Sequence, residues 1–387
     1  MNRLGQQIGG IYYKSPIVVS SSPLTDRIEL IKRAEDNGAG AVSTKLTLIK
    51  SPVKGVRRMY AEHNYFVFNN SDKRNELDEG VELVRKAKEQ TDLVVWTNIS
   101  GYGDDIESWI QIAKAMEDAG ADALELNFCC GNMSVSDESK SKLKIGSLVA
   151  REPELMRDII LALKGAVKIP VWAKGATLFA VENAKIVEQA GGDGIVTGGA
   201  GGLCPPPINI FNKGVCKVPG AINGGYGGTN GPSFRPLTYR AIHATTKVTN
   251  LPVAGGGGLA DYTHIIEAIM FGASLTCMCS KLLMDGFGVI KTINEQLEKF
   301  MEEQGYKTIE DMRGLALKHL VAASDKLEYS FSVPTVDEEK CSGCGSCSRI
   351  GSCTAITIKD KRAVVDPKEC EQCGLCVTLC PRGAIRY

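Results

Sequence analysis

Eight short apolar runs, rich in β-branched residues, recur along the chain and alternate with segments of helical periodicity. The runs are PIVVS from Pro16, GAVST from Gly40, LVVWTNIS from Leu93, ALELN from Ala123, PVWAK from Pro170, GIVTG from Gly194, PVAGG from Pro252 and SLTCMC from Ser274. This alternation indicates repeated βα units around a parallel sheet. Because eight such units are the number that closes a barrel, the sequence predicts an α/β fold built as a (β/α)8 TIM barrel.

Helical segments are expected between and after these runs, at residues 106–119, 154–163, 180–189, 262–271, 287–304 and 308–323. Two connections, residues 47–77 and 204–233, are longer than the others. Long loops at the C-terminal face of a barrel are where such proteins build their sites, and the second loop, rich in Gly and Pro, is interpreted as a lid. We expect a barrel domain over residues 1–330 and a smaller domain over residues 331–387.

The smaller domain contains eight cysteines in two groups, Cys341, Cys344, Cys347 and Cys353, then Cys370, Cys373, Cys376 and Cys380. The spacing C-x2-C-x2-C lets one short loop supply three thiolates to an iron–sulfur cubane, while the fourth comes from elsewhere. In the bacterial two-cluster ferredoxin pattern, the fourth cysteine of each group serves the other cluster. That pattern predicts one cluster on Cys341, Cys344, Cys347 and Cys380, and a second on Cys370, Cys373, Cys376 and Cys353. Cys353 departs from the pattern, because five residues precede it where three are usual.

Zinc sites and disulfides explain this spacing less well. Zinc sites normally take two C-x2-C pairs for each ion, whereas this chain has two triplets, each followed by a fourth cysteine. Disulfides need an oxidising compartment, and the N-terminus MNRLGQQIGG has no apolar stretch like that of a signal peptide. We therefore expect a cytoplasmic protein.

Composition argues against two broad classes of partner. The chain has 45 basic and 45 acidic residues, a balance that does not suit a general nucleic-acid or membrane-surface role. Its most apolar stretch, residues 265–284, contains Glu267 and Lys281 and is predicted to be a helix followed by a strand, not a membrane span.

Glycines and small residues gather where the last two predicted strands end. The run VAGGGGL, which includes Gly256 and Gly257, follows the seventh strand, and Cys279 and Ser280 follow the eighth. Barrels commonly bind a phosphate group here through backbone N–H groups. The sequence therefore predicts a phosphate site at this place.

Two lysines stand at predicted strand ends. Lys45 ends the second strand and Lys174 the fifth, so both are expected to point into the mouth of the barrel. Lys174 suits the electron-rich edge of a reduced flavin, whose negative charge needs a nearby cation. The alternative for either lysine is an ordinary surface position.

The fourth run continues into ADALELNFCCGN, which resembles the ALELNLSCPN signature of class 1 dihydroorotate dehydrogenases and of the FMN barrel of dihydropyrimidine dehydrogenases. Further motifs similar to that family are SSSPLTD, STK with Lys45, REPELMRDI, IPVWAKG with Lys174, GGDGIVT, GGTNG with Gly228, RPLTYRAI and AGGGGLADYTHIIEAIMFGAS. A barrel followed by a two-cluster ferredoxin tail is also the order found in dihydropyrimidine dehydrogenases. The resemblance covers nearly the whole chain.

The resemblance implies FMN at the barrel mouth, two [4Fe–4S] clusters in the tail, and a cysteine that acts as general acid or base opposite the flavin. The family's active cysteine falls on Cys130. A hydride moves between the flavin and one carbon of a C–C bond while a proton moves at the neighbouring carbon. A partly buried thiol with a pKa of about 8 to 9 suits that proton transfer. Cys129 is interpreted as a small core residue, which is also the alternative for Cys130.

By the same resemblance, Asn98 and Asn127 hydrogen-bond the flavin or the substrate, and Gly228 belongs to the cofactor site. Asn127 is also expected to contact the substrate, as are Asn69 and Asn132.

The chain also departs from the family at the substrate side of the site. Ser71 stands where dihydropyrimidine dehydrogenases carry the carboxylate of an N-x-E motif, and Gly131 replaces a proline. Gly199 and Ala200 stand where the family has an Asn-Thr pair. A site that recognises uracil or orotate through hydrogen bonds loses several partners at once. We therefore expect retained flavin chemistry with a rebuilt substrate pocket.

The sequence thus predicts a flavin and iron–sulfur oxidoreductase that interconverts an activated C=C bond of a small substrate and its saturated form, with the clusters relaying electrons. No G-x-G-x-x-G followed by a suitably spaced acidic residue is present, so NAD(P)H is not expected to bind this chain. The expected electron donor is a separate FAD- and NAD(P)H-binding subunit or a ferredoxin, and a homo-oligomer is expected. The alternatives are an electron-transfer subunit whose FMN barrel does not act on a small substrate, and a barrel without flavin that serves as a scaffold. Cys130 favours the enzyme, because an electron relay needs no proton donor at the flavin.

Overall fold

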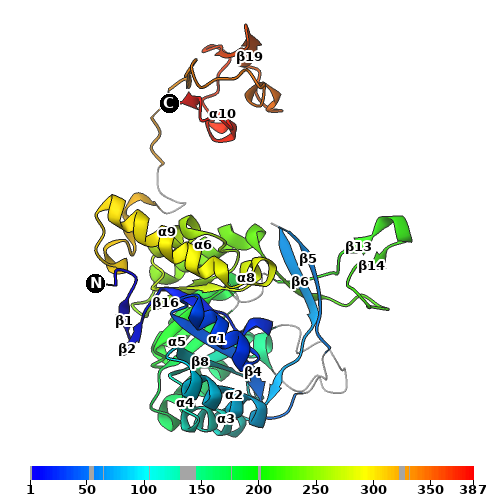
Figure 1. Ribbon diagram of the computed structural model, residues 1–387, viewed down its shortest axis with the longest axis vertical. Coiled ribbons are helices and arrows are strands. Elements are labelled where there is room, and N and C mark those ends of the chain that lie inside the picture. Colours follow the sequence, from blue (N-terminus) through cyan, green and yellow to red (C-terminus); the bar gives the residue numbers. More distant parts are fainter. Residues whose placement is uncertain are drawn as a thin grey trace. The chain divides into compact units, whose positions relative to one another are not determined.

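The computed structural model describes residues 2–51, 56–63, 65–103, 105–130, 145–175, 177–198, 202–321, 327–330 and 332–387. The chain divides into two compact units, Met1–Leu320 and Val321–Tyr387. The larger unit runs from blue to yellow-orange in Figure 1 and the smaller from orange to red. The division falls before residue 330, where the sequence analysis puts the boundary.

Eight parallel strands form a closed barrel in the larger unit. They are β3 (Ile17–Val19), β4 (Ala41–Leu48), β8 (Val94–Ile99), β9 (Ala123–Phe128), β10 (Val171–Gly175), β11 (Gly194–Thr197), β16 (Val253–Gly256) and β17 (Leu275–Met278). Each strand pairs with the next of this series, and β17 pairs with β3 to close the ring. Each observed strand coincides with one of the eight predicted runs, which confirms the predicted TIM barrel.

Helices surround the barrel in Figure 1. They are α1 (Ile28–Asp36), α2 (Leu77–Gln90), α3 (Ile106–Asp118), α4 (Pro153–Ala166), α5 (Ala180–Gln189), α6 (Arg235–Thr246), α7 (Tyr262–Met270), the short α8 (Ser280–Asp285) and α9 (Gly288–Gln304). Each long helix turns an apolar stripe inward, as α3 does with Trp109, Ile112 and Met116. The helices predicted at 106–119, 154–163, 180–189, 262–271 and 287–304 are confirmed. None of the described helices combines the length and apolar character that a membrane crossing needs.

The helix predicted over residues 308–323 is wrong. The described part of that segment holds two 3-10 turns, η7 (Ile309–Asp311) and η8 (Leu315–His319). Gly314 lies between them with φ +74°, and its N–H donates to Ile269 O at 3.0 Å. A residue in the left-handed region ends a helix, so the helical sequence pattern does not continue through Gly314.

Inward side chains of the barrel strands form layers, because alternate residues of a strand face opposite sides. At one end, the rings of Trp96 and Trp172 lie 4.7 Å apart, and Trp96 Nε1 donates to the Tyr13 hydroxyl at 3.0 Å. Tyr13 belongs to β2 (Ile11–Tyr13), which pairs with β1 (Gln6–Ile8). Burying an aromatic side chain of this kind contributes about 1.5–3 kcal/mol. This end of the barrel is therefore packed with side chains, which leaves the C-terminal ends of the strands for a site.

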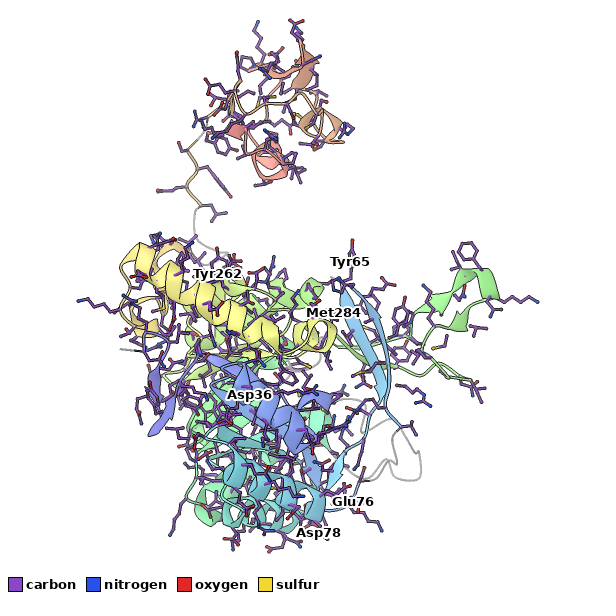
Figure 2. The ribbon with its side chains drawn as sticks, viewed as in Figure 1. Asp36, Tyr65, Glu76, Asp78, Tyr262 and Met284 are labelled. Atoms are coloured by element: carbon purple, nitrogen blue, oxygen red, sulfur yellow. The ribbon has the colours of Figure 1, made fainter. Side chains whose placement is uncertain are left out.

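The two long connections form a second sheet. The first connection supplies the hairpin of β5 (Arg58–Glu62) and β6 (Phe66–Ser71). It also contains β7 (Asn75–Glu76), which lies outside this second sheet and pairs with β4 of the barrel. From the second come β12 (Leu203–Cys204) and β15 (Gly227–Asn230), and the order is β12-β15-β6-β5. Figure 2 labels Tyr65 at the turn of the β5–β6 hairpin and Met284 on α8. These two elements are joined where His63 Nε2 lies 3.0 Å from Asp285 Oδ1.

The segment interpreted as a lid has two parts. Gly228 and Asn230 of β15 line the cavity described below. The hairpin of β13 (Ile208–Asn209) and β14 (Val215–Cys216) instead projects away from the barrel in Figure 1, and Phe211 between these strands is 95% exposed. The strands next to the barrel, not the projecting hairpin, thus cover the site.

The smaller unit is built from short elements. β18 (Thr335–Val336) pairs with β21 (Ile385–Arg386), β19 (Ile356–Lys359) pairs with β20 (Arg362–Val365), and α10 (Leu375–Leu379) lies between β20 and β21 in the chain. Its core contains few large apolar side chains and several cysteines. An apolar core this limited supplies little stability, so we expect its cysteines to contribute to folding.

Candidate active site

A cavity of about 360 Å³ lies at the C-terminal ends of the barrel strands. This volume lies within the range of small-molecule and cofactor sites. The sequence-predicted residues that line it are Lys45, Asn69, Asn127, Cys130, Lys174, Gly228, Gly257, Cys279 and Ser280. The fold thus brings together positions from strands and loops that lie far apart in the sequence.

Other predicted residues lie elsewhere. Asn98 is fully buried behind Asn127, whose Nδ2 donates to Asn98 Oδ1 at 2.9 Å. Gly256 also lies outside the cavity lining, and its carbonyl accepts a hydrogen bond from Thr238 Oγ1 at 3.0 Å. Asn132 lies outside the described residues, as do Gly131, Gly199 and Ala200.

Cys130 follows β9, and Asn127 orients it. Asn127 Oδ1 accepts hydrogen bonds from the backbone N–H groups of Cys129 and Cys130, at 3.2 and 3.1 Å. Asn127 Nδ2 lies 3.4 Å from Cys130 Sγ. Both ends of the Asn127 amide therefore hold this turn, and an N–H donor faces the sulfur.

The surroundings of Cys130 stabilise its thiolate. Among the interactions that lower the pKa of Cys130, the hydrogen bond with Cys129 has the largest effect. The charge of Arg74, the hydrogen bond with the Asn127 amide and the charge of Lys174 follow in that order. Together they outweigh burial and lower the pKa of Cys130 to about 5. The hydrogen bond with Cys130 and burial raise the pKa of Cys129. The pKa of about 8 to 9 expected from an ordinary thiol is therefore too high for Cys130, which is the proton acceptor of this pair.

Glu125 is a site residue that the sequence analysis does not predict. Its side chain is 1% exposed, and its Oε2 accepts hydrogen bonds from Ser43 Oγ and Asn98 Nδ2, both at 2.5 Å. Its Oε1 lies 3.4 Å from Lys174 Nζ. Burial alone lowers the pKa of Lys174, but the charge of Glu125, helped by nearby thiols, more than offsets this and raises it. One sequence feature could have indicated Glu125. It is a charged residue in an apolar barrel strand, and it stands two residues before Asn127 and therefore faces the same side of the strand.

Asp72 is a second such residue and anchors a buried charge cluster. Its side chain is 2% exposed and forms ion pairs with Lys45, with Arg57 at 3.4 Å and with Arg74 at 3.5 Å. Burial, followed by the charge of Arg74, lowers the pKa of Lys45, and Asp72 opposes this effect. Asp72 directly follows Ser71 in the chain, and its carboxylate pairs with Lys45.

Glycines form one wall of the cavity. A Cβ atom on Gly257, where φ is +120°, would lie 2.6 Å from Thr238 Oγ1, and one on Gly258, where φ is +77°, would lie 2.6 Å from Gly231 O. A wall without side chains leaves backbone N–H groups accessible, as a phosphate group requires. The residues present therefore fit FMN, with the glycine wall suited to its phosphate and Lys45 and Lys174 supplying positive charge.

Asn69 faces the same cavity from β6. Among the described residues, nothing hydrogen-bonds its buried Oδ1. A buried carbonyl oxygen without a donor is costly, so this atom is a natural acceptor for a ligand N–H or O–H group.

The cysteines of the smaller unit gather in two sets. Cys341, Cys344, Cys347 and Cys380 line one small cavity. Cys376 lies near Cys353, Cys370 and Cys373, which add to burial in raising its pKa. The structure thus brings together the two ligand sets of the ferredoxin pattern, including the Cys353 that departs from the usual spacing.

Backbone donors point at this sulfur-rich region. The Ala363 N–H donates to Cys341 Sγ at 3.4 Å and the Ala384 N–H donates to Cys380 Sγ at 3.3 Å. No three described His, Cys, Asp or Glu side chains converge closely enough to bind one metal ion. A cubane does not require such convergence, because each of its irons takes its own thiolate.

Comparison with known proteins places this geometry in a family. The dihydroorotate dehydrogenase family model matches residues 3–301, and the 4Fe-4S binding domain model matches residues 363–386. The NAD-dependent dihydropyrimidine dehydrogenase subunit PreA of Escherichia coli strain K12 is 27% identical over 87% of this chain and 82% of its own. The dihydroorotate dehydrogenase B (NAD(+)) catalytic subunit of Thermoplasma acidophilum is 26% identical over 82% of this chain and 100% of its own. That of Pyrococcus abyssi is 28% identical over 80% of this chain and 97% of its own.

The matched barrel and the iron–sulfur segment after it define an oxidoreductase that acts on CH–CH bonds. The chain belongs to the dihydroorotate dehydrogenase family. Membership implies FMN in the barrel, and the second match implies a [4Fe–4S] cluster in residues 363–386. That segment contains the second cysteine group, whereas the first group precedes it.

Proposed function

We propose that this chain interconverts a C=C bond and its saturated form in a pyrimidine-like substrate, with FMN at the barrel mouth and Cys130 transferring the proton. The observation that carries the proposal is that Cys130, Lys174 and the glycine wall line one cavity. The relatives named for dihydropyrimidine and dihydroorotate support the substrate class.

The proton chemistry belongs to Cys130. FMN, when bound, supplies hydride exchange at one carbon of the C–C bond. Cys130 Sγ accepts a proton from the neighbouring carbon, or returns one to it. With a pKa of about 5, the sulfur is a thiolate at neutral pH. Removal of a proton then needs no prior step, whereas reduction of a C=C bond requires that Cys130 be protonated first.

The other residues hold and enclose the substrate. Lys174 keeps a positive charge at the cavity, and Asn69 Oδ1 accepts a substrate N–H group. Met59 and Val67 of the β5–β6 hairpin line the cavity and exclude water from it.

Electrons are proposed to pass through two [4Fe–4S] clusters, one on Cys341, Cys344, Cys347 and Cys380 and the other on Cys370, Cys373, Cys376 and Cys353. The ferredoxin spacing and the two sets of neighbouring cysteines support this assignment. A separate subunit that binds FAD and NAD(P)H, or a ferredoxin, is the proposed donor. The relatives' names, which describe them as subunits, support a multi-chain enzyme.

The test is anaerobic. The purified protein is reduced, and flavin reoxidation is followed optically after addition of uracil, orotate or activated alkenes that are not pyrimidines. Rapid reoxidation by a pyrimidine supports the proposal. Reoxidation by another alkene but not by a pyrimidine would support the proposed reaction and overturn the proposed substrate class. If no alkene reoxidises the flavin, the result favours an electron-transfer subunit.

The Cys130→Ala variant tests the proton step. It should keep its flavin and cluster spectra and lose about 10²- to 10⁴-fold in turnover, the usual contribution of a general acid or base. Cys216→Ala, on the projecting hairpin, is the matched control and should behave like the parent protein. Parent-like turnover in Cys130→Ala would remove Cys130 from the mechanism.

A further inference from the structure

Glu125 and Lys174 form a buried ion pair beneath the cavity. The Lys174 side chain is 9% exposed and that of Glu125 is 1% exposed, and Lys174 Nζ lies 3.4 Å from Oε1 and 3.5 Å from Oε2 of the carboxylate. Lys174 lines the cavity and Glu125 does not. The pair therefore presents its positive end to the cavity and its negative end to the barrel interior.

The carboxylate is held by two further donors. Ser43 Oγ and Asn98 Nδ2 both donate to Oε2 at 2.5 Å, while Lys174 Nζ lies at similar distances from both carboxylate oxygens. Among the described residues, Glu125 is the carboxylate that forms an ion pair with Lys174. The other groups whose charge favours protonated Lys174 are the thiols Cys129, Cys277 and Cys130.

A buried lysine without a counter-ion loses its proton readily, because burial disfavours the charged form. We propose that Glu125 is a positioning residue that keeps Lys174 protonated at the cavity and acts on Cys130 and the flavin through that charge. This inference rests on the proposed function. It assigns a role in the site to Glu125, whose carboxylate does not line the cavity.

Glu125→Gln isolates the charge. The glutamine Oε1 can still accept from Ser43 and Asn98, so the amide chain from Asn98 through Asn127 to Cys130 is kept while the negative charge is lost. If Lys174 then loses its proton, one of the positive charges that favour the Cys130 thiolate disappears. If the thiols alone keep Lys174 protonated, removal of Glu125 instead leaves an uncompensated positive charge.

These two cases shift two observables in opposite directions. One observable is the pH midpoint of Cys130 alkylation by iodoacetamide, located on the peptide by mass spectrometry. The other is the reduction potential of the bound flavin, and both use the anaerobic holoprotein. We expect Glu125→Gln to raise the alkylation midpoint by about one pH unit and to make the flavin potential more negative, because a nearby cation stabilises both a thiolate and an anionic reduced flavin.

Four further variants complete the test. Lys174→Met removes the positive charge directly and should shift both observables as Glu125→Gln does. The double variant should add little to Lys174→Met, since Glu125 acts through Lys174. Glu125→Asp should recover most of the parent values, and Ser43→Ala, which removes one hydrogen bond and keeps the charge, should leave them unchanged.

A lower alkylation midpoint or a more positive potential in Glu125→Gln would overturn the inference, as would parent values for both. So would additive shifts in the double variant. Neither observable requires turnover. Loss of the proposed function, for example through a fully active Cys130→Ala, would therefore be seen separately from failure of this inference.

Discussion

At the scale of single residues, the site depends on charges buried beside a thiol. The positive charges of Arg74 and Lys174 favour the thiolate of Cys130. Each of these cations forms an ion pair with a carboxylate of the protein, Arg74 with Asp72 and Lys174 with Glu125. Buried charges are retained in proteins when they are paired in this way. The pairs let the cavity keep positive charge without exposing it to water.

The pH dependence of Cys130 follows from these charges. Below its pKa of about 5 the sulfur is a thiol and reacts slowly, and above it the reactive thiolate predominates, so iodoacetamide alkylation of Cys130 should rise with a midpoint near pH 5. Arg74→Gln should raise the midpoint, because it removes a charge that lowers the pKa. Arg85→Gln, on the exposed face of α2, is the control and should leave it in place. A parent midpoint near about pH 8.5 would contradict the prediction.

The buried ion pairs of Asp72 should also stabilise the fold. Asp72→Asn removes the carboxylate that pairs with buried Lys45, and breaking a buried pair in this way costs about 3–5 kcal/mol. The measurement is the shift in urea midpoint at constant slope. Asp285→Asn affects the more exposed contacts of Asp285 with Lys281 and His63 and should cost less than about 1 kcal/mol. Equal effects of the two substitutions would show that the Asp72 cluster is not structurally important.

At the scale of elements, the short loop after β16 combines backbone geometry with binding. Gly257 and Gly258 adopt positive φ and touch neighbouring backbone or side-chain atoms so closely that no Cβ atom fits. The following helix, α7, is capped at its N-terminus by Asp261, whose carboxylate accepts hydrogen bonds from the N–H groups of Thr263 and His264. A capped helix and a loop conformation that only glycine adopts readily thus define the glycine wall.

Gly257→Ala should weaken FMN binding. The methyl group would lie 2.6 Å from Thr238 Oγ1 at a φ of +120°, so the loop must shift at a cost of about 1–3 kcal/mol, which is roughly 5- to 150-fold in affinity. Fluorescence of released FMN measures the affinity. Gly288→Ala, at the start of α9 where a Cβ meets no other atom within 4 Å, is the matched control. Parent-like affinity in Gly257→Ala would mean that the wall does not contact the cofactor.

At the scale of the whole molecule, the chain carries two compact units with different means of stabilisation. The barrel unit has a large apolar core, whereas the small unit has a limited one in which cysteines take part. Loss of a cluster ligand should therefore act on the small unit and leave flavin binding in the barrel unchanged.

Iron analysis tests this division. Two [4Fe–4S] clusters correspond to about eight iron atoms per chain, and Cys353→Ala should lower the count toward about four, with FMN unchanged. Cys216→Ala, outside both cysteine groups, should keep the parent iron content. About four irons in the parent protein would reduce the proposal to one cluster. Parent-like iron in Cys353→Ala would show that another group completes the second cluster.

The sequence by itself determined the eight strands, most of the helices and the two cysteine groups, because two-residue and helical periods and C-x2-C spacing are properties of short segments. It failed over residues 308–323, where the conformation of Gly314 overrides the helical pattern. Lys45, Lys174 and Cys130 were predictable because each stands in a recognisable motif next to an apolar run, although β4 continues past Lys45 to Leu48, so that Lys45 does not end its strand as predicted. Their partners were not. Asp72 lies 27 residues from Lys45 and Glu125 lies 49 residues from Lys174, and nothing local in the sequence links either pair. Only the tertiary structure decided these contacts, because the pairing of β9 with β10 brings Glu125 to Lys174 and the packing of the segment after β6 brings Asp72 to Lys45, and burial excludes the water that would otherwise solvate each charge.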